Sequence, residues 1–207
     1  MNKEALLIFQ KNPVKGLVKT RLASTMGEDL ALSIYGFLLD RTYEETKQID
    51  QEILVFFSDY IPKEHPFPFH ALHLQEGMDL GVKMKNAFRK AFSLGFKKAV
   101  IIGTDCPDLT SELLIRSFSL LDQSDLVIGP AGDGGYYLLG MNREHSYLFD
   151  GIEWSTSQVF SRTLELARHH HLSFSLLPML HDIDNEADWN RFVTQNPNYG
   201  KLSGYHH

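Results

Sequence analysis

Short apolar runs alternate with amphipathic helical patterns along the chain, and this alternation restricts the possible folds more than any other feature. Four runs have the length and composition of buried strands: ALLIF from Ala5, ILVFF from Ile53, AVII from Ala99 and DLVIG from Asp125. Between them, apolar residues recur with helical spacing at Leu30, Ile34, Phe37 and Leu38, and at Leu80, Met84, Ala87, Phe88 and Ala91. The pattern predicts an α/β fold, a three-layer α/β/α Rossmann-like sandwich with a mostly parallel sheet, whose ligands bind beyond the carboxyl ends of the strands.

The length of 207 residues predicts one domain, because each half of a divided chain would bury little surface. We expect residues 1–200 to form this domain and residues 201–207, KLSGYHH, to be a frayed C-terminal tail. The single cysteine, Cys106, excludes an intramolecular disulfide and a zinc site built on several thiolates. The N-terminal apolar run is too short for a signal peptide, and no later run approaches the ~20 residues of a membrane span, which predicts a cytoplasmic protein.

The charge balance limits the possible partners. A net charge of -6 and a pI near 5.9 argue against nucleic acid, since proteins that bind it need a broad basic surface to displace counterions from phosphates. We therefore expect neither nucleic acid nor a membrane as a partner, and any phosphate binding must be local.

A local basic segment, KNPVKGLVKTRL from Lys11, follows the first predicted strand directly. Its cationic residues gather around Gly16: Lys11, Lys15, Lys19 and Arg21. Glycine lets the backbone approach a ligand closely, and lysine and arginine suit a polyphosphate. A solvated basic turn is the alternative interpretation. A P-loop is rejected because its pattern needs Gly-Lys-Ser/Thr, whereas Val18 precedes Lys19.

A second segment, IIGTDCPDLT from Ile101, carries an apolar strand into two aspartates just before a predicted helix. Asp105 falls at the carboxyl end of the strand, where a carboxylate that binds Mg²⁺ is useful; an Asx turn is the alternative. Asp108 lies nearer the helix start and is interpreted as a capping residue, with Thr110 as a good N-cap. Cys106 is interpreted as a packed small side chain, because no activating histidine is near it in sequence.

A third segment, GPAGDGGYYLLG from Gly129, is rich in glycine around Asp133. This density suits close contact with a ligand, for which Asp133, Tyr136 and Tyr137 are candidate polar groups. A hairpin with a turn-forming Asp-Gly pair is the alternative, and Tyr137 fits a core position at least as well. Farther along, Thr156 or Ser157 is predicted to cap the next helix.

The last segment, HDIDNEADW from His181, places Asp182 and Asp184 two residues apart, so both would face the same way in an extended strand. Either carboxylate could complete a metal site with Asp105; two acids in a solvated loop are the alternative. Asn185 is predicted to cap the final helix. The run from His169 to His171 is interpreted as a solvated helix end.

Together these segments resemble the bacterial glycosyltransferase-A-like proteins related to the molybdenum-cofactor and 2-phospholactate guanylyltransferases, within the nucleotide-diphospho-sugar transferase superfamily. The matching stretches are PVKGLVKTRLA from Pro13, GTDCPDLT from Gly103, GPAGDGGYYLLG from Gly129, WST from Trp154 and DIDNEADW from Asp182. They span nearly the whole chain. At Gln10 and Lys11 this sequence departs from relatives, which often have smaller residues or arginine there.

The resemblance implies roles for individual residues. A nucleoside triphosphate or nucleotide sugar would bind at the N-terminal loop through Lys11, Lys15, Gly16, Lys19, Thr20 and Arg21. Asp105 and Asp184 would hold Mg²⁺ or Mn²⁺, with Asp182 as a neighbour. The pocket for a small-molecule acceptor would be bordered by Asp133, Gly134, Gly135, Tyr136, Trp154, Ser155 and Thr156.

These roles predict an enzyme, a transferase. The leading hypothesis is metal-dependent nucleotidyl transfer from a nucleoside triphosphate to a small phosphorylated acceptor, with Lys19, Arg21 and Asp105 as catalytic residues. The first alternative is a glycosyltransferase that uses a nucleotide-diphospho-sugar donor. The second is a noncatalytic nucleotide-binding module, which retention of the metal carboxylates beside Lys19 and Arg21 disfavours.

Overall fold

A computed structural model describes residues 3–64 and 71–199 of the chain. The predicted tail, 201–207, and part of the proline-rich loop, 65–70, lie outside the described residues. The strands are β1 (Glu4–Gln10), β2 (Glu52–Phe57), β3 (Ala71–Leu74), β4 (Lys98–Ile102), β5 (Leu126–Pro130), β6 (Tyr136–Met141) and β7 (Phe174–Leu176). The helices are α1 (Thr20–Met26), α2 (Glu28–Thr46), α3 (Leu80–Ser93), α4 (Ser111–Leu120), α5 (Val159–His169) and α6 (Glu186–Gln195), with short 3₁₀ helices at Ser146–Phe149 and Pro197–Tyr199.

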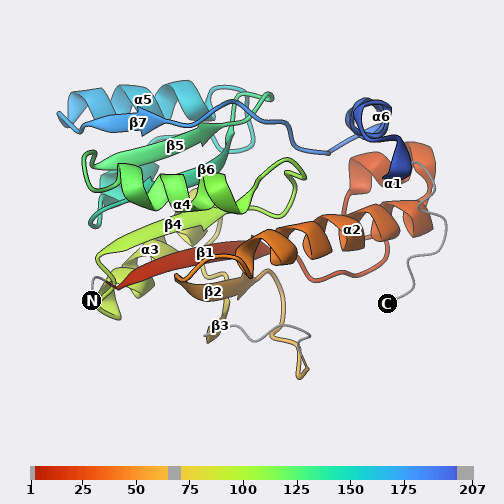
Figure 1. Cartoon of the computed structure of the whole chain (residues 1–207), viewed down its shortest axis with the longest axis horizontal. Helices are drawn as coiled ribbons and strands as arrows, with labels where there is room; N and C mark the ends of the chain where they lie inside the picture. The colour runs from red at the N-terminus through yellow and green to blue at the C-terminus, as the bar shows by residue number, and fades with distance from the viewer. Residues whose placement is uncertain (1–2, 65–70, 200–207) are drawn as a thin grey trace.

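All seven of these strands form one sheet with the order β3-β2-β1-β4-β6-β5-β7 (Figure 1). Strand β1 pairs in parallel with β2 and β4, β2 with β3, and β5 with β7. Strand β6 runs antiparallel to both of its neighbours, because it returns from β5 as a hairpin. The predicted mostly parallel sheet is confirmed. Because β1, β2 and β4 are parallel, their carboxyl ends lie at the same end of the sheet.

Apolar side chains cover both faces of the sheet, as the buried strands require. Alternation along β1 sends Ala5 and Leu7 into one core, with α3 and α5, and Leu6 and Ile8 into another, with α4. A third cluster joins α1, α2 and α6 through Leu22, Phe37 and Trp189 among others. Figure 1 shows α1 and α6 together at the end of the molecule toward which β1 and β4 point.

Capping residues fix several helix starts. The side chain of Thr110 accepts a hydrogen bond from the amide of Leu113 and begins α4, as predicted, whereas Asp108 lies outside the cap, which corrects its predicted role. Asn185 begins α6 in a capping box with Asp188, which confirms that prediction.

The predicted cap of α5 is wrong. The helix begins after Gln158, which makes no side-chain cap, because Thr156 and Ser157 still belong to the preceding turn. There the hydroxyl of Thr156 accepts a hydrogen bond from the amide of Gln158 at 3.4 Å. At the other end of α5, His169, His170 and His171 are all exposed, as predicted.

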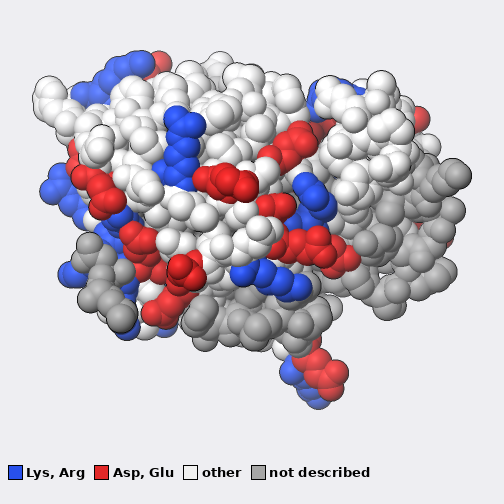
Figure 2. All heavy atoms as spheres, in the orientation of Figure 1, with Lys and Arg blue, Asp and Glu red and all other residues white. Residues whose placement is uncertain are grey.

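The surface in Figure 2 carries acidic and basic side chains interspersed over the face that is viewed. Among the described residues, no helix is long and apolar enough to cross a membrane.

Candidate functional site

A cleft of about 750 Å³ opens at the end of the sheet where the carboxyl ends of β1, β2 and β4 lie. This is where ligands bind in open α/β sheets. The cleft gathers most of the residues predicted from sequence: Lys11, Lys19, Thr20, Arg21, Asp105, Asp133, Gly135, Tyr136, Trp154, Ser155, Thr156 and Asp184. Asp182 and Tyr137 also line it, so all four predicted segments meet at one place.

Three predicted residues do not line this cleft: Lys15, Gly16 and Gly134. The ammonium group of Lys15 pairs with Asp29 of α2 at 2.5 Å, on the exposed surface, and the hydrogen bond to Asp29 raises the pKa of Lys15. Gly16 has φ 79° and packs near Glu28. The basic loop therefore divides, with Lys11, Thr20 and Arg21 at the cleft and Lys15 beside α2.

Gly134 has a structural role in the turn between β5 and β6. It has φ 91°, and a Cβ atom there would lie 2.2 Å from the carbonyl oxygen of Ser157. Asp133 also supports this turn, because its Oδ1 accepts a hydrogen bond from the amide of Gly135 at 2.9 Å. The hairpin that was the alternative interpretation is thus present, and its turn borders the cleft.

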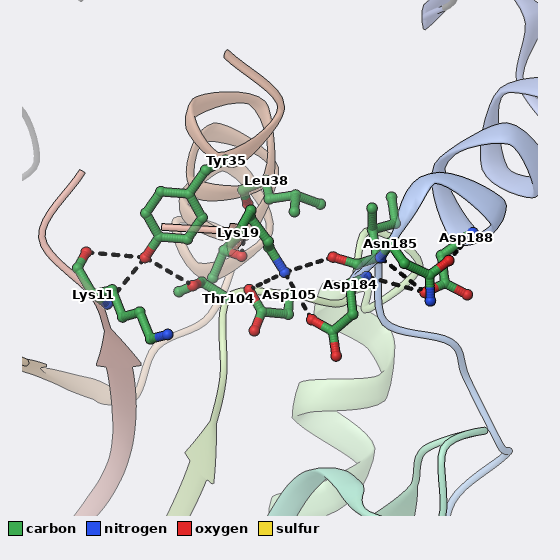
Figure 3. A network of polar contacts seen from close by, with 11 residues as sticks. Lys11, Lys19, Tyr35, Leu38, Thr104, Asp105, Asp184, Asn185 and Asp188 are labelled. Atoms are coloured by element: carbon green, nitrogen blue, oxygen red, sulfur yellow. Dashed lines mark hydrogen bonds and ion pairs between the residues drawn. The ribbon is translucent and has the colours of Figure 1, made fainter. Parts of the chain in front are cut away.

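The polar centre of the cleft is Lys19, whose side chain is only 5% exposed (Figure 3). Its Nζ lies 2.7 Å from Oδ1 of Asp105, 3.3 Å from Oδ1 of Asp184 and 2.6 Å from the carbonyl oxygen of Ile183. The side chains of Asp105 and Asp184 are 43% and 38% exposed. Two carboxylates predicted as metal ligands are thus brought together, with a lysine between them.

Asp182 lies close enough to this pair to sense its charge. Burial, and then the negative charges of Asp105 and Asp184, raise the pKa of Asp182 to about 7. The ammonium group of Lys19 acts in the opposite direction but does not cancel these effects. Next to Lys19 the cleft thus has three carboxyl groups and one ammonium group, an arrangement that suits a further cation, whereas Lys11, Arg21 and Lys83 also line the cleft.

A buried tyrosine connects the N-terminal loop to β4. The Tyr35 hydroxyl bonds to both the amide and the carbonyl group of Lys11 and lies 3.4 Å from the Thr104 hydroxyl (Figure 3). Burial raises the pKa of Tyr35, so the phenol stays protonated and can donate. These bonds fix the backbone from which the Lys11 side chain projects.

The other wall of the cleft is apolar, with Phe9, Met84, Tyr136, Trp154 and Val159. Trp154 lies directly on α3, because a Cβ atom at Gly81 would be 2.1 Å from Trp154 Nε1. Its neighbour Ser155 has φ 64°, an uncommon conformation for a non-glycine residue and one that is enriched at functional sites.

Several lining residues were missed from sequence: Tyr35, Ser58, Gln75, Lys83 and Met84. Ser58 directly follows β2, so its position at the end of a predicted strand was a usable signal, whereas Gln75 follows β3, which the sequence did not indicate. The other three lie within helices, where the sequence pattern favours a core or a solvated face. Cys106 and Tyr137 are buried, which confirms the packed interpretation of the cysteine and the core position of the tyrosine.

Comparisons with known proteins find chains of the same fold. A protein from Desulfovibrio desulfuricans G20, described as a candidate nucleotide-diphospho-sugar transferase, is 31% identical with a TM-score of 0.87, over 99% of this chain and 92% of that one. A 2-C-methyl-D-erythritol 4-phosphate cytidylyltransferase from Thermus thermophilus shares the fold at 14% identity and a TM-score of 0.57, over 94% and 99% of the two chains. Rv0371c from Mycobacterium tuberculosis H37Rv, solved in complex with manganese, shares the fold at 11% identity and a TM-score of 0.52, over 94% of this chain and 99% of that one.

A search of curated proteins found no match. The structural matches confirm the predicted fold class and the resemblance to the nucleotide-diphospho-sugar transferase superfamily, and they support the predicted enzyme class, a transferase. A family model covers residues 47–156, more than half of the chain. The chain therefore belongs to the family described as "uncharacterized protein conserved in bacteria (DUF2064)".

Proposed function

We propose that the protein is a metal-dependent nucleotidyltransferase that transfers a nucleotidyl group from a nucleoside triphosphate to a small phosphorylated acceptor. The observation that carries the proposal is the shared cleft, in which Lys11 and Arg21 lie with the carboxylates of Asp105 and Asp184. Cations suit a polyphosphate, and paired carboxylates suit the divalent ion that accompanies it.

In the proposed reaction, an oxygen of the acceptor phosphate attacks the α-phosphorus of the triphosphate. The new P–O bond forms as the bond to the bridging oxygen breaks, and pyrophosphate leaves with that electron pair. The side chains of Lys11 and Arg21, with Thr20 beside them, bind the phosphates and stabilise the charge that develops there. One well-placed donor of this kind contributes about 2.7–4 kcal/mol to lowering a barrier.

The carboxylates fit a magnesium or manganese ion. Among residues 3–64 and 71–199, no group of three or more acidic, histidine or cysteine side chains could hold a metal alone. Magnesium, however, commonly takes one or two carboxylates and completes its shell with water and substrate phosphates. Asp105 and Asp184, both partly exposed to the cleft, match this pattern, and the bound ion would supply charge neutralisation at the phosphates.

The acceptor would bind along the opposite side of the cleft. Asp133, Gly135, Tyr136 and the segment 154–156 border it there, and the aromatic rings offer an apolar surface for the acceptor body. Lys83 of α3 also lines the cleft and can bind the acceptor phosphate.

Glycosyl transfer from a nucleotide sugar is the second candidate. It is favoured by the description of the Desulfovibrio desulfuricans relative, which names a nucleotide-diphospho-sugar transferase. The same phosphate and metal groups would serve both reactions. Their products differ, since nucleotidyl transfer releases pyrophosphate and glycosyl transfer releases a nucleoside diphosphate.

The first experiment is a thermal-shift screen of the four nucleoside triphosphates and common nucleotide sugars, each with and without Mg²⁺. A metal-dependent rise in melting temperature with one triphosphate supports the proposal and identifies the base. A rise only with a nucleotide sugar supports glycosyl transfer. Binding without any turnover, measured as pyrophosphate or nucleoside diphosphate release, supports a noncatalytic module.

The matched variants are Asp105→Ala and Asp108→Ala. Asp108 lies three residues away but outside the cleft, and it is exposed. We expect Asp105→Ala to lower turnover by orders of magnitude while Asp108→Ala stays near wild type. Near-normal turnover in folded Asp105→Ala protein would contradict the metal role.

A further inference from the structure

Lys19 makes as many bonds to the protein as its side chain can donate. A lysine ammonium group has three donor hydrogens. Here Nζ has three oxygen partners, on Asp105, Asp184 and Ile183, at 2.7, 3.3 and 2.6 Å (Figure 3). No donor is left for a phosphate, in contrast to the role expected from sequence.

The backbone of Lys19 is fixed as well. The residue adopts the left-handed conformation, φ 48° and ψ 45°, at the N-cap of α1, and its carbonyl oxygen accepts the first bond of that helix, from Ala23 at 2.8 Å. A non-glycine residue in this conformation is strained and persists only where its surroundings hold it. The side chain of this residue is held at its far end by the three bonds of Nζ.

The partners of Lys19 belong to separate parts of the chain. Asp105 follows β4, and Ile183 and Asp184 precede α6. The amide of Ile183 also donates to the carbonyl oxygen of Asp105 at 2.9 Å, so these two segments already lie together. Without a cation between them, Asp105 and Asp184 would face each other as like charges, with Asp182 nearby.

Arg21 and Lys11 differ from Lys19 in their exposure and in their ion pairs. Both line the cleft and both are exposed. Within the part of the chain that the structure describes, the side chain of neither makes an ion pair, whereas Lys19 makes two. Of the cations near the N-terminal loop, the cleft therefore has one that is committed to the protein and two that are available to a ligand; Lys83 of α3, the fourth cation that lines it, is the one proposed for the acceptor.

We propose that Lys19 is a positioning residue, the resident counter-cation of Asp105 and Asp184, and that phosphate binding falls to Lys11 and Arg21. This inference rests on the proposed function for the identity of the phosphate ligand. It has a further consequence: the ammonium group competes for the two carboxylates, so a divalent ion binds weakly until a nucleotide brings its own phosphate ligands.

The test compares Lys19→Met with Arg21→Met, two neighbouring changes that each remove one positive charge. The first measurement is Mn²⁺ binding in the absence of nucleotide. Binding is detected by electron paramagnetic resonance and by the change in melting temperature. We expect Lys19→Met to melt below wild type, to bind Mn²⁺ roughly tenfold more tightly, and to regain its melting temperature when Mn²⁺ is added, because opposite charges a few ångströms apart interact strongly at a partly buried site. Arg21→Met should bind Mn²⁺ like wild type. Unchanged or weaker Mn²⁺ binding in Lys19→Met overturns the proposal.

The second measurement is triphosphate binding by calorimetry, with the triphosphate identified in the screen, in EDTA or, if the wild type binds it only with metal, at saturating Mg²⁺. We expect affinity within roughly twofold of wild type for Lys19→Met and a loss of about tenfold for Arg21→Met, since charge-assisted bonds to phosphate are the stronger class. Equal losses in both variants overturn the proposal.

Two further outcomes are decided by additional measurements: a Lys19→Met variant that does not fold, and a protein that binds no triphosphate. If Lys19→Met fails to fold, the pair Lys19→Met with Asp184→Asn, which removes one charge of each sign, replaces it in the EDTA measurement, with the same expectations. If no triphosphate binds to any form of the protein, either with Mg²⁺ or without it, the proposed function fails, and the Mn²⁺ measurement on its own decides whether Lys19 is the counter-cation.

Discussion

The hydroxyl group of Tyr35 makes two hydrogen bonds to a single residue, Lys11, accepting from its amide at 3.0 Å and donating to its carbonyl oxygen at 2.9 Å. The residue is 2% exposed, so its hydroxyl group is largely shielded from bulk water. We expect Tyr35→Phe to lower the free energy of unfolding by about 1–3 kcal/mol, because two backbone groups lose their partner. The donor KM should rise as well, because the Lys11 backbone directs a side chain at the cleft.

Urea unfolding and donor kinetics measure the two effects. Tyr147→Phe is the control, since that hydroxyl bonds to Nδ1 of His145 at 2.8 Å and does not line the cleft. It should change stability alone. An unchanged donor KM in Tyr35→Phe would show that the position of Lys11 does not depend on this hydroxyl.

The contact between Gly81 and Trp154 predicts a separate effect on the acceptor. A methyl group at Gly81 would meet the indole ring at 2.1 Å, so Gly81→Ala must displace Trp154 from the apolar wall. Overpacking of this kind costs about 1–3 kcal/mol of stability. We expect the acceptor KM to rise in both Gly81→Ala and Trp154→Ala while the donor KM stays unchanged. If Trp154→Ala leaves the acceptor KM unaltered, the ring does not border the acceptor.

Cys106 is predicted to be chemically inert in the native protein. Burial raises the pKa of the thiol, so the reactive thiolate is scarce near neutral pH, and the side chain is 7% exposed. Because the chain has one cysteine, labelling by a disulfide reagent reports on this residue alone. We expect slow labelling in buffer and complete labelling in urea, with little acceleration of the native rate between pH 7 and about 9. Rapid labelling of the native protein would show that the cleft opens to Cys106.

The central strands could be predicted from sequence because each is a continuous apolar run, and Asp105 could be placed because it directly follows one of them. Strands β3 and β7 have only four and three residues and are half-exposed at the sheet edges, so they lack that signal. Strand β6 is apolar, but an apolar run of this kind does not by itself show whether the segment is a strand or another kind of buried segment.

The role of Lys19 could not be predicted from the local sequence, because it depends on a partner that is distant in the chain. Its type and its loop indicate a phosphate ligand, yet its partner Asp184 lies 165 residues away in the sequence. The packing of α6 against α1, with the hydrogen bond from the Ile183 amide to the Asp105 carbonyl oxygen, brings that carboxylate to the ammonium group. Lys15 shows the reverse case, because a residue of the same type in the same loop turns to Asp29 on the surface.

A final prediction concerns the pH dependence of stability at the start of β5. Asp125 Oδ2 accepts hydrogen bonds from the amide and hydroxyl of Ser173, at 3.0 and 2.7 Å, and Arg143 lies 3.4 Å from Oδ1. The bonds from Ser173, with a smaller effect of Arg143, lower the pKa of Asp125. A carboxyl group whose pKa is lower in the folded protein stabilises the fold above its unfolded pKa, and this contribution disappears as the pH falls through the folded value.

We therefore expect Asp125→Asn to unfold at lower urea concentration than wild type at pH 7, and the difference to shrink below about pH 4, where the wild-type carboxyl group also becomes neutral. Asp29→Asn, which removes an exposed ion pair with Lys15, is the control and should change stability little at either pH, because exposed pairs contribute little. A difference for Asp125→Asn that stays constant from pH 7 to pH 3 would mean that its hydrogen bonds, rather than its charge, join the ends of β5 and β7.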